Sequence, residues 1–230
     1  MKTLIKSLII LLLFTTFSFS QSGCSKYYPF KEGTTLQYTN YDKKGKESGE
    51  IIYKVSDYRK SGGKEWITMT MNTSDKKGNG IDGISYDISC DGSGVSIDFK
   101  SLGNMAMLKQ FESMETKITG TNTTLPNSLS VGQELPDSNM NMEISMSGIS
   151  MKVNTLIKDR KVTGKEKVTT AAGTYNCLIL EQTTIANVMG KKISTTTKSW
   201  FAEGVGMVKQ ESYNENKKLT NSTKLTALNI

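Results

Sequence analysis

Apolar and polar residues alternate along most of this chain, and that period of two restricts its fold more than any other feature. Ile51, Tyr53 and Val55 would share one face of a strand. The same alternation recurs in later segments, at 67–71, 84–90, 95–99 and 140–146. Because successive side chains on a β-strand point to opposite faces, the pattern predicts half-buried antiparallel strands.

Stretches of turn-forming residues separate the alternating segments. They are rich in Asp, Lys, Ser and Gly and lie at 42–46, 60–64, 75–79 and 91–94. Such residues favour tight hairpins, so consecutive strands are expected to pair. The segment 175–184 is apolar at successive positions, which predicts a central strand buried on both faces. The sequence therefore predicts an all-β fold, an antiparallel, strongly curved sheet or incomplete β-barrel.

One segment breaks the alternation. Between Ser101 and Glu115, apolar residues fall three apart, and Met, Ala, Leu, Lys and Gln are frequent. This spacing predicts one short helix, which we expect to cover one end of the sheet. A loop-like stretch near 119–130 follows, and it is the place where the chain offers a subdivision. Otherwise we expect a single β-rich domain over 21–230.

The first 20 residues have the three parts of a secretory signal peptide. Two lysines lie at 2–6, an apolar run follows at 8–14, and small residues at 18–20 precede an expected cleavage site before Gln21. The apolar run is too short for a membrane span. We therefore expect an exported protein of the periplasm or cell surface, with no transmembrane segment in the mature chain.

The three cysteines are Cys24, Cys90 and Cys177. An exported chain meets an oxidising compartment, so pairing is expected. Cys177 lies in the most apolar run of the mature chain, so we predict a Cys24–Cys90 disulfide and a buried thiol at Cys177. A lipid anchor on Cys24 is the alternative, because a small residue precedes that cysteine. However, the aliphatic residue usual three positions earlier is absent, and lipidation would leave Cys90 unpaired.

The chain contains no histidine. This excludes Ser-His-Asp triads, imidazole general bases and histidine-ligated zinc. Cys177 has no histidine to activate it, and burial would raise its pKa. No glycine-rich loop opens a helix to hold phosphate. We therefore expect a non-enzymatic protein with no catalytic residue and no cofactor. A carbohydrate-active hydrolase is the enzyme alternative, and it would need two convergent acids.

The net charge of +7 is carried almost wholly by lysine, since Arg59 and Arg160 are the only arginines. Dispersed lysines are typical of solvated strand faces and protected sheet edges. Proteins that read nucleic acids more often show clustered arginines and a helical or aromatic reading element. We expect no nucleic-acid partner.

Methionines concentrate in two places, and two interpretations compete. Soft thioethers can hold Cu(I) or Ag(I). Alternatively, they face inward and form the flexible wall of an apolar ligand pocket. Strict alternation with Asn and Glu favours the pocket, so we predict no metal site. The predicted ligand-lining residues are Met69, Met71, Tyr86, Met140, Met142, Ile144, Met146 and Met151.

Two motifs resemble a known family. Residues 172–177 form a turn around Gly173 that launches a buried strand, and 200–209 combine Trp200 with a bend at Gly204 and Gly206, where we expect positive φ. Together with the aromatic stretch 27–33 and the hairpin 41–46, they resemble TapB-like exported proteins of the domain of unknown function 3108 type, from Bacteroidetes. Similar glycine bends occur in the half-barrels of lipoprotein carriers. The resemblance implies a barrel-like envelope protein and transfers no catalytic residue.

The functional expectation follows from the apolar residues predicted on the concave face of the sheet. We expect a cell-envelope protein that binds a lipid or another apolar or amphipathic ligand there. The alternative is a structural or surface-assembly role, in which strand edges or the helix dock another envelope protein.

Overall fold

The computed structural model describes residues 23–102, 115–146, 149–188 and 190–230. They form one sheet of 13 strands in the order β6-β8-β9-β10-β11-β12-β13-β1-β2-β3-β4-β5-β7. The elements are β1 (Thr35–Asp42), β2 (Glu47–Ser61), β3 (Lys64–Asp75), β4 (Gly80–Cys90), β5 (Gly94–Ile97), α1 (Phe99–Leu102), β6 (Glu115–Gly120), β7 (Thr123–Pro126), β8 (Ser138–Met146), β9 (Ile149–Thr170), β10 (Gly173–Val188), β11 (Lys191–Ala202), β12 (Gly206–Tyr213) and β13 (Leu219–Asn229).

All neighbouring strands pair antiparallel, as the alternation predicts. The expected signal peptide at 1–20 lies outside the described residues. So does most of the helix expected over 101–115: α1 (Phe99–Leu102) overlaps its first two positions, and β6 (Glu115–Gly120) begins at its last. Among the described residues, no helix has the length and apolar character needed to cross a membrane.

Three of the hairpin turns share one hydrogen-bonding arrangement. In the β1–β2 turn, the Asp42 carboxylate accepts hydrogen bonds from the backbone N–H groups of Lys44 and Lys46, at 2.8 and 2.9 Å. Asp75 in the β3–β4 turn and Asn214 in the β12–β13 turn accept the corresponding pairs of bonds. A side-chain oxygen that bonds the backbone two residues ahead favours a turn, so these residues fix where each strand ends.

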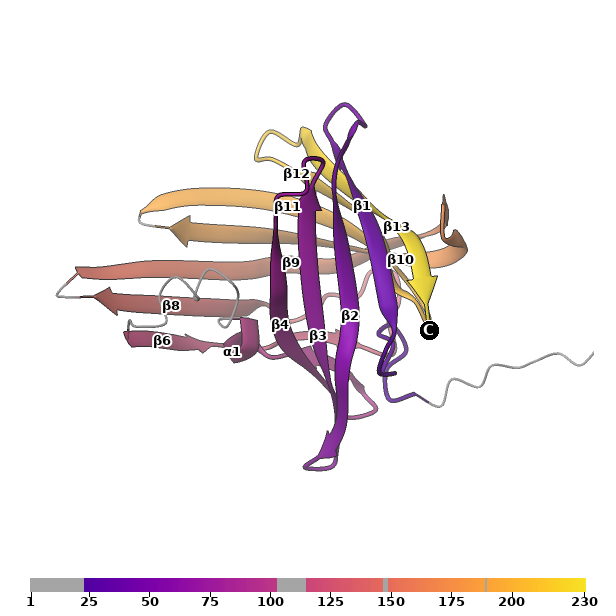
Figure 1. Ribbon diagram of the computed structural model, residues 1–230, viewed down its shortest axis with the longest axis horizontal. Coiled ribbons are helices and arrows are strands. Elements are labelled where there is room, and N and C mark those ends of the chain that lie inside the picture. Colours follow the sequence, from indigo (N-terminus) through magenta and orange to yellow (C-terminus); the bar gives the residue numbers. More distant parts are fainter. Residues whose placement is uncertain (1–22, 103–114, 147–148, 189) are drawn as a thin grey trace, which may run out of the picture.

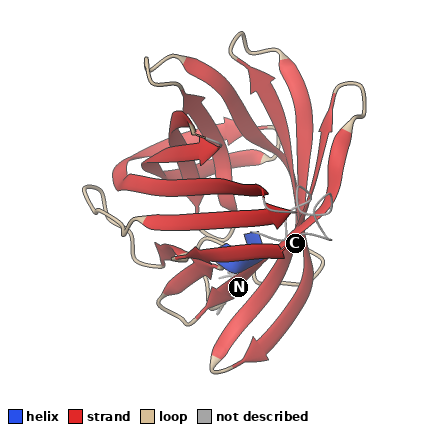
Figure 2. Cartoon of the chain, turned by 90° about the vertical axis from the view of Figure 1, so that its left-hand side faces the viewer, coloured by secondary structure: helices blue, strands red, loops and turns tan. Residues whose placement is uncertain are grey.

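The sheet curves strongly without closing. Its edge strands, β6 and β7, are consecutive in the sequence and are separated only by Thr121 and Asn122. Because consecutive Cα atoms are about 3.8 Å apart, this link holds the two edges within about 11 Å of each other. Thr121 donates its backbone N–H to the Asn139 carbonyl at 2.9 Å, beside the start of β8. The result is an incomplete barrel, in which β2, β3 and β4 run steeply across β6, β8 and β9 (Figure 1) and the sheet bends round on itself (Figure 2).

Two apolar clusters form the core. The first combines buried residues of β2, β3, β4, β5, β7 and β10 with Tyr27 and Leu135, so it lies between the two crossing parts of the sheet. The second combines residues of β1 and β9–β13. Strand β10 contributes Leu178 and Leu180 to the first cluster and Cys177 to the second. Both of its faces are therefore apolar, which is why its sequence does not alternate.

The N-terminal segment is fastened to the barrel. Cys24 forms a disulfide with Cys90 at the end of β4, and Cys177 is a buried free thiol. The Asn127 amide donates to the carbonyls of Cys24 and Gly92 at 2.8 and 2.9 Å. Tyr27 follows three residues after Cys24 and is only 2% exposed. The segment before β1 is thus part of the core.

Gly204 and Gly206 have the positive φ that the sequence predicts, and Gly173 has it as well. Gly173, Gly204 and Gly206 have φ of 138°, 75° and 100°, a region that other residues enter only with strain. A Cβ at Gly206 would also lie 3.2 Å from the Tyr27 carbonyl oxygen. Gly206 therefore permits both the bend before β12 and the close approach of the N-terminal segment.

Replacing Gly206 by alanine tests this packing. We expect Gly206→Ala to lower the free energy of unfolding by about 1–3 kcal/mol, measured by urea denaturation. Gly132→Ala is the matched control, because Gly132 also has positive φ, 92°, but nothing lies within 4 Å of its Cβ position. Equal losses in the two variants would show that the Tyr27 contact contributes nothing.

Candidate functional site

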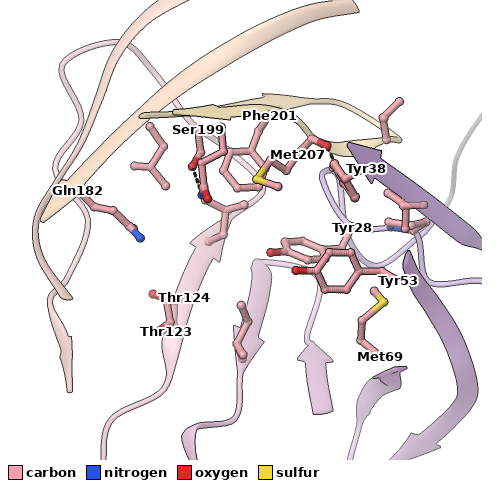
Figure 3. Close-up of a pocket in the computed structure, with 18 of the residues that line it drawn as sticks. Tyr28, Tyr38, Tyr53, Met69, Thr123, Thr124, Gln182, Ser199, Phe201 and Met207 are labelled. Atoms are coloured by element: carbon pink, nitrogen blue, oxygen red, sulfur yellow. Dashed lines mark hydrogen bonds between the residues drawn. The ribbon is translucent and has the colours of Figure 1, made fainter. Parts of the chain in front are cut away.

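A cavity of about 250 Å³ lies inside the curved sheet. Its lining comes from the N-terminal segment, from β1–β5 and β7 on one side, and from β9–β12 on the other. Aliphatic contacts come from Leu36, Met69, Leu180, Val205 and Met207. The cavity is therefore built by elements that are far apart in sequence and meet only because the sheet curves (Figure 3).

Four tyrosines, Tyr28, Tyr38, Tyr53 and Tyr86, line this cavity. The rings of Tyr38 and Tyr53 pack edge to face, with centroids 5.7 Å apart. The Tyr38 hydroxyl donates to the Met207 carbonyl at 2.7 Å, which ties β1 to β12 across the lining. Edge-to-face packing fixes the orientation of the two rings relative to each other, and Figure 3 shows the Tyr53 oxygen at the cavity.

The other three hydroxyls are different. Within the described ranges, no hydrogen bond joins the hydroxyls of Tyr28, Tyr53 or Tyr86 to another protein atom, and these half-buried side chains border the cavity, whereas the fully buried unpartnered polar atoms are Thr34 Oγ1 and Thr197 Oγ1. Figure 3 shows the Tyr28 and Tyr53 oxygens at the cavity. Burial raises the pKa of Tyr28 to about 12 and also raises the pKa of Tyr53 and Tyr86. These phenols therefore stay protonated at neutral pH and can donate hydrogen bonds to a ligand.

Among the residues that the structure describes, Arg160 of β9 is the only charged one that lines the cavity, and it is 3% exposed. Its Nη1 and Nη2 donate to the carbonyls of Pro136 and Thr124, both at 2.8 Å, and its Nε donates to Gln182 Oε1 at 3.3 Å. The guanidinium thus connects β9 to the edge strand β7. No carboxylate of the described residues forms an ion pair with it.

A β-bulge turns Arg160 inward. The β9–β10 register shifts here, since Lys161 pairs with Glu181 and Lys158 pairs with Thr183. Asp159, in the extra length of β9, has a positive φ of 54°. Bulges bend a strand and redirect its side chains, often beside functional sites. The local departure from the ladder thus explains how a charged residue comes to lie in an apolar interior.

The cavity favours a negative ligand group over a positive one. No Asp or Glu is among the described residues that line it. Besides Arg160 and the tyrosines, its polar groups include Gln182, Ser199 and Gln210, and the Gln210 amide donates to Ser199 Oγ at 2.9 Å. A mostly apolar wall with a few convergent polar groups is typical of small-molecule sites.

The sequence-predicted lining residues divide into two groups. Met69 and Tyr86 line the cavity, whereas Met71 on β3 does not. The others on β8 and β9 also lie apart from it and form a separate apolar surface, in which Ile144 pairs with Met151 across the two strands. This surface contains Met140, Met142, Ile144 and Met151. The Met146 side chain lies outside the described residues.

Sequence reasoning missed Tyr28, Tyr38, Tyr53 and Arg160 as site residues. Tyr53 belongs to an alternating segment, but alternation does not show which buried residues reach a common hollow. The sequence did offer one indication that Arg160 has a special role, because it is one of two arginines in a lysine-rich chain. Arginine is the cation that proteins choose for buried or bidentate anion contacts, so its rarity here marks the position.

Trp200 lies directly before the cavity-lining residue Phe201 on β11, and two side-chain contacts hold it in place. It is 5% exposed, its Nε1 donates to Glu166 Oε2 at 2.7 Å, and the Lys209 ammonium lies 4.1 Å from its ring centroid. The next residue, Phe201, lines the cavity. Nearby, burial raises the pKa of Cys177 to about 11, so its thiol is protonated at neutral pH.

A second hollow is an open groove of about 980 Å³ beside Lys26, Glu166, Lys167 and Glu203. Lys26 and Glu203 form an ion pair there at 2.8 Å, and both side chains are about half exposed. Its charges are mixed and solvated, so it has no marked preference for a ligand. Within the described ranges, no three Cys, Asp or Glu side chains gather as metal ligands.

The comparisons with known proteins agree with this architecture. The DUF3108-like family model matches residues 31–225, which is most of the chain. The chain belongs to the DUF3108-like family. This is the family type that the motifs at 172–177 and 200–209 resemble, so that prediction is confirmed.

Two solved structures share this DUF3108-like fold. A predicted exported protein with a YmcC-like fold from Bacteroides fragilis is similar with a TM-score of 0.69 and 18% identity, covering 90% of this chain and all of that one. A predicted lipoprotein from Parabacteroides distasonis gives 0.68 and 20%, with the same coverage. At these identities the likeness establishes the fold alone. No curated protein sequence matches the chain.

Proposed function

We propose that this DUF3108-like protein is a non-enzymatic protein of the bacterial cell envelope that binds an apolar or amphipathic ligand inside its curved sheet. The observation that carries the proposal is the interior cavity, walled by tyrosines and aliphatic side chains. Export is supported by the leader at 1–20 and by the descriptions of the two similar structures as an exported protein and a lipoprotein.

The cavity volume limits the ligand. Small-molecule sites commonly enclose about 300–1,000 Å³, and this cavity, at about 250 Å³, lies just below that range. A slim ligand such as a single aliphatic chain suits it better than a bulky or multi-chain lipid. The flexible side chains of Met69 and Met207 allow the wall to adapt to different chains.

The chemistry of the site supports binding rather than catalysis. The chain contains no histidine, and the Cys177 thiol has a pKa of about 11. No pair of acids faces the cavity among the described residues, whereas a glycoside hydrolase needs two carboxyl groups across the scissile bond. Arg160 and the neutral tyrosines are suited to holding and orienting a ligand.

Native mass spectrometry of the protein purified from its own envelope, followed by lipid extraction, tests the proposal. We expect a bound small molecule with an aliphatic chain. Calorimetry with octanol supplies a defined apolar probe for the emptied protein. A protein that carries no ligand and does not bind octanol would overturn the proposal.

A cavity-filling variant locates the binding. We expect Met207→Trp to weaken octanol binding at least tenfold, because the indole would occupy the interior, while the main-chain carbonyl that accepts from Tyr38 is kept. Ile193→Trp is the control, since Ile193 is 48% exposed on β11 and does not line the cavity. Octanol binding that is equal in the two variants would place the ligand elsewhere. Near-UV circular dichroism verifies that both variants fold.

A second candidate function is docking of another envelope protein. Strands β6 and β7 are the edges of an unclosed sheet, so each has one side without a neighbouring strand among those described. Such edges can accept a strand from a partner. A pull-down from envelope extract that recovers the same partner with wild type and with Met207→Trp would favour docking over cavity binding.

A further inference from the structure

We propose that the polar end of the ligand is an anion, held by Arg160 together with the hydroxyls of Tyr28, Tyr53 and Tyr86. The ligand class is then a single-chain anionic amphiphile, with a carboxylate or a phosphate monoester on an aliphatic chain. This inference rests on the proposed function and adds the chemistry of the group that is recognised.

The first argument is that the buried charge of Arg160 has no ion-pair partner among the described residues. A guanidinium has five N–H donors and a fixed positive charge. In this protein three of its hydrogen bonds go to neutral oxygens, of Thr124, Pro136 and Gln182. The Asp137 carboxylate attracts the Arg160 charge, but it is exposed and forms no ion pair with Arg160. A buried charge without a counter-charge is costly, and an anion in the cavity would remove that cost.

The second argument comes from the tyrosine hydroxyls that border the cavity. Three half-buried tyrosines, from the N-terminal segment, β2 and β4, line the same cavity as Arg160, and no hydrogen bond within the described part of the chain uses their hydroxyls. Each can donate one hydrogen bond. Carboxylates and phosphates only accept hydrogen bonds when ionised, so a set of donors without an acidic neighbour matches them and disfavours cations.

A purely structural role for Arg160 explains less. Its bonds to Thr124 and Pro136 do fasten β7 to β9 across the open side of the sheet. A neutral glutamine or asparagine donates similar bonds without burying a charge. The fastening involves none of the hydroxyls of Tyr28, Tyr53 and Tyr86. An anion accounts for the charge and the hydroxyls together.

Calorimetry with three probes of equal chain length tests the inference on the full mature protein, emptied of ligand. Octanol reports apolar binding alone, octanoate adds a carboxylate, and octyl phosphate adds a phosphate. We expect at least one of the two anions to bind about 10- to 100-fold more tightly than octanol, as charge-assisted hydrogen bonds provide. The tighter of the two identifies the head group.

The outcomes separate the two proposals. If all three probes bind with equal affinity, the anion site is wrong and the cavity-binding function stands. If no probe binds, the function itself fails. An octyl phosphate that binds only through surface lysines would lose its affinity in high salt and would be unaffected by Met207→Trp, and that result would also overturn the inference.

Removing one hydroxyl gives a site-specific version of the test. We expect Tyr53→Phe to weaken binding of the preferred anion about tenfold and to leave octanol binding unchanged. Tyr41→Phe is the matched control, because Tyr41 lies on β1 outside the cavity lining, and it should alter neither affinity. Arg160→Lys, which keeps the charge but loses the planar fork, should reduce the preference for the anion further. Parallel losses for octanol and the anion in Tyr53→Phe would contradict the assignment.

Discussion

Reduction of the Cys24–Cys90 disulfide should lower the free energy of unfolding by about 4 kcal/mol. The bond joins residues 66 positions apart. It restricts the unfolded chain, and reduction gives the unfolded chain back conformational entropy worth about 4 kcal/mol for a loop of that length. Urea denaturation with and without dithiothreitol measures the difference. Because folded proteins are typically stable by about 5–15 kcal/mol, such a loss is a large fraction of the total.

The same reduction should weaken ligand binding, because the disulfide fastens the segment that carries Tyr28. Cys24 is tied to Cys90 and, through its carbonyl, to Asn127 at 2.8 Å, and Tyr28 lines the cavity only four residues later. Once released, this segment can leave the barrel and expose the site. Octanol binding should therefore fall in dithiothreitol.

Two variants provide the controls for the disulfide. The double variant Cys24→Ser/Cys90→Ser should show the lower stability and no further response to dithiothreitol. Cys177→Ala should keep the full response, because Cys177 is a free thiol. If dithiothreitol destabilised the double variant as strongly as wild type, the effect would not come from this bond.

The strand arrangement was readable from the sequence because it depends on local chemistry. Alternation shows that Val55 and Tyr53 share a face, and the turns show where each strand stops, since Asp42 organises its own hairpin. The apolar run in β10 indicates burial on both faces, and the structure places Leu180 and Cys177 in different clusters. These features are fixed within about ten residues of chain, so tertiary context does not alter them.

The cavity lining was harder to predict from the sequence, because it depends on the curvature of the sheet. Met69 on β3 and Met142 on β8 have the same alternating surroundings, yet only Met69 reaches the cavity. The difference is set by how far the sheet bends between β3 and β8, and the alternation of apolar and polar residues does not predict that curvature. Arg160 is a sharper case, because the bulge between Lys158 and Lys161 changes which residues of β9 face inward. Local departures from the ladder therefore escape a prediction based on regular strands.

The core and the cavity are two parts of one packing arrangement. Met69 belongs to the first apolar cluster and also lines the cavity, while Tyr27 closes that cluster next to the Gly206 bend. A protein interior normally packs at near-crystalline density, so an interior hollow needs a rigid surrounding wall. The rigidity comes from fully buried side chains on the strands behind the cavity, among them Ile67 of β3.

Ile67→Ala should therefore be the most damaging single substitution in that wall. Ile67 is 0% exposed and packs in the first cluster, and deleting its branched side chain should cost about 2–5 kcal/mol through lost burial and the void left behind. Ile81→Ala on β4 makes the same chemical change where the side chain is 46% exposed, so it should cost under about 1 kcal/mol in the same urea titration. Because Met69 lies two residues from Ile67 on the same face, the void adjoins the ligand cavity, and octanol should occupy it and restore part of the lost stability. Equal losses at the two positions would mean that β3 does not form the packed wall on which the cavity depends.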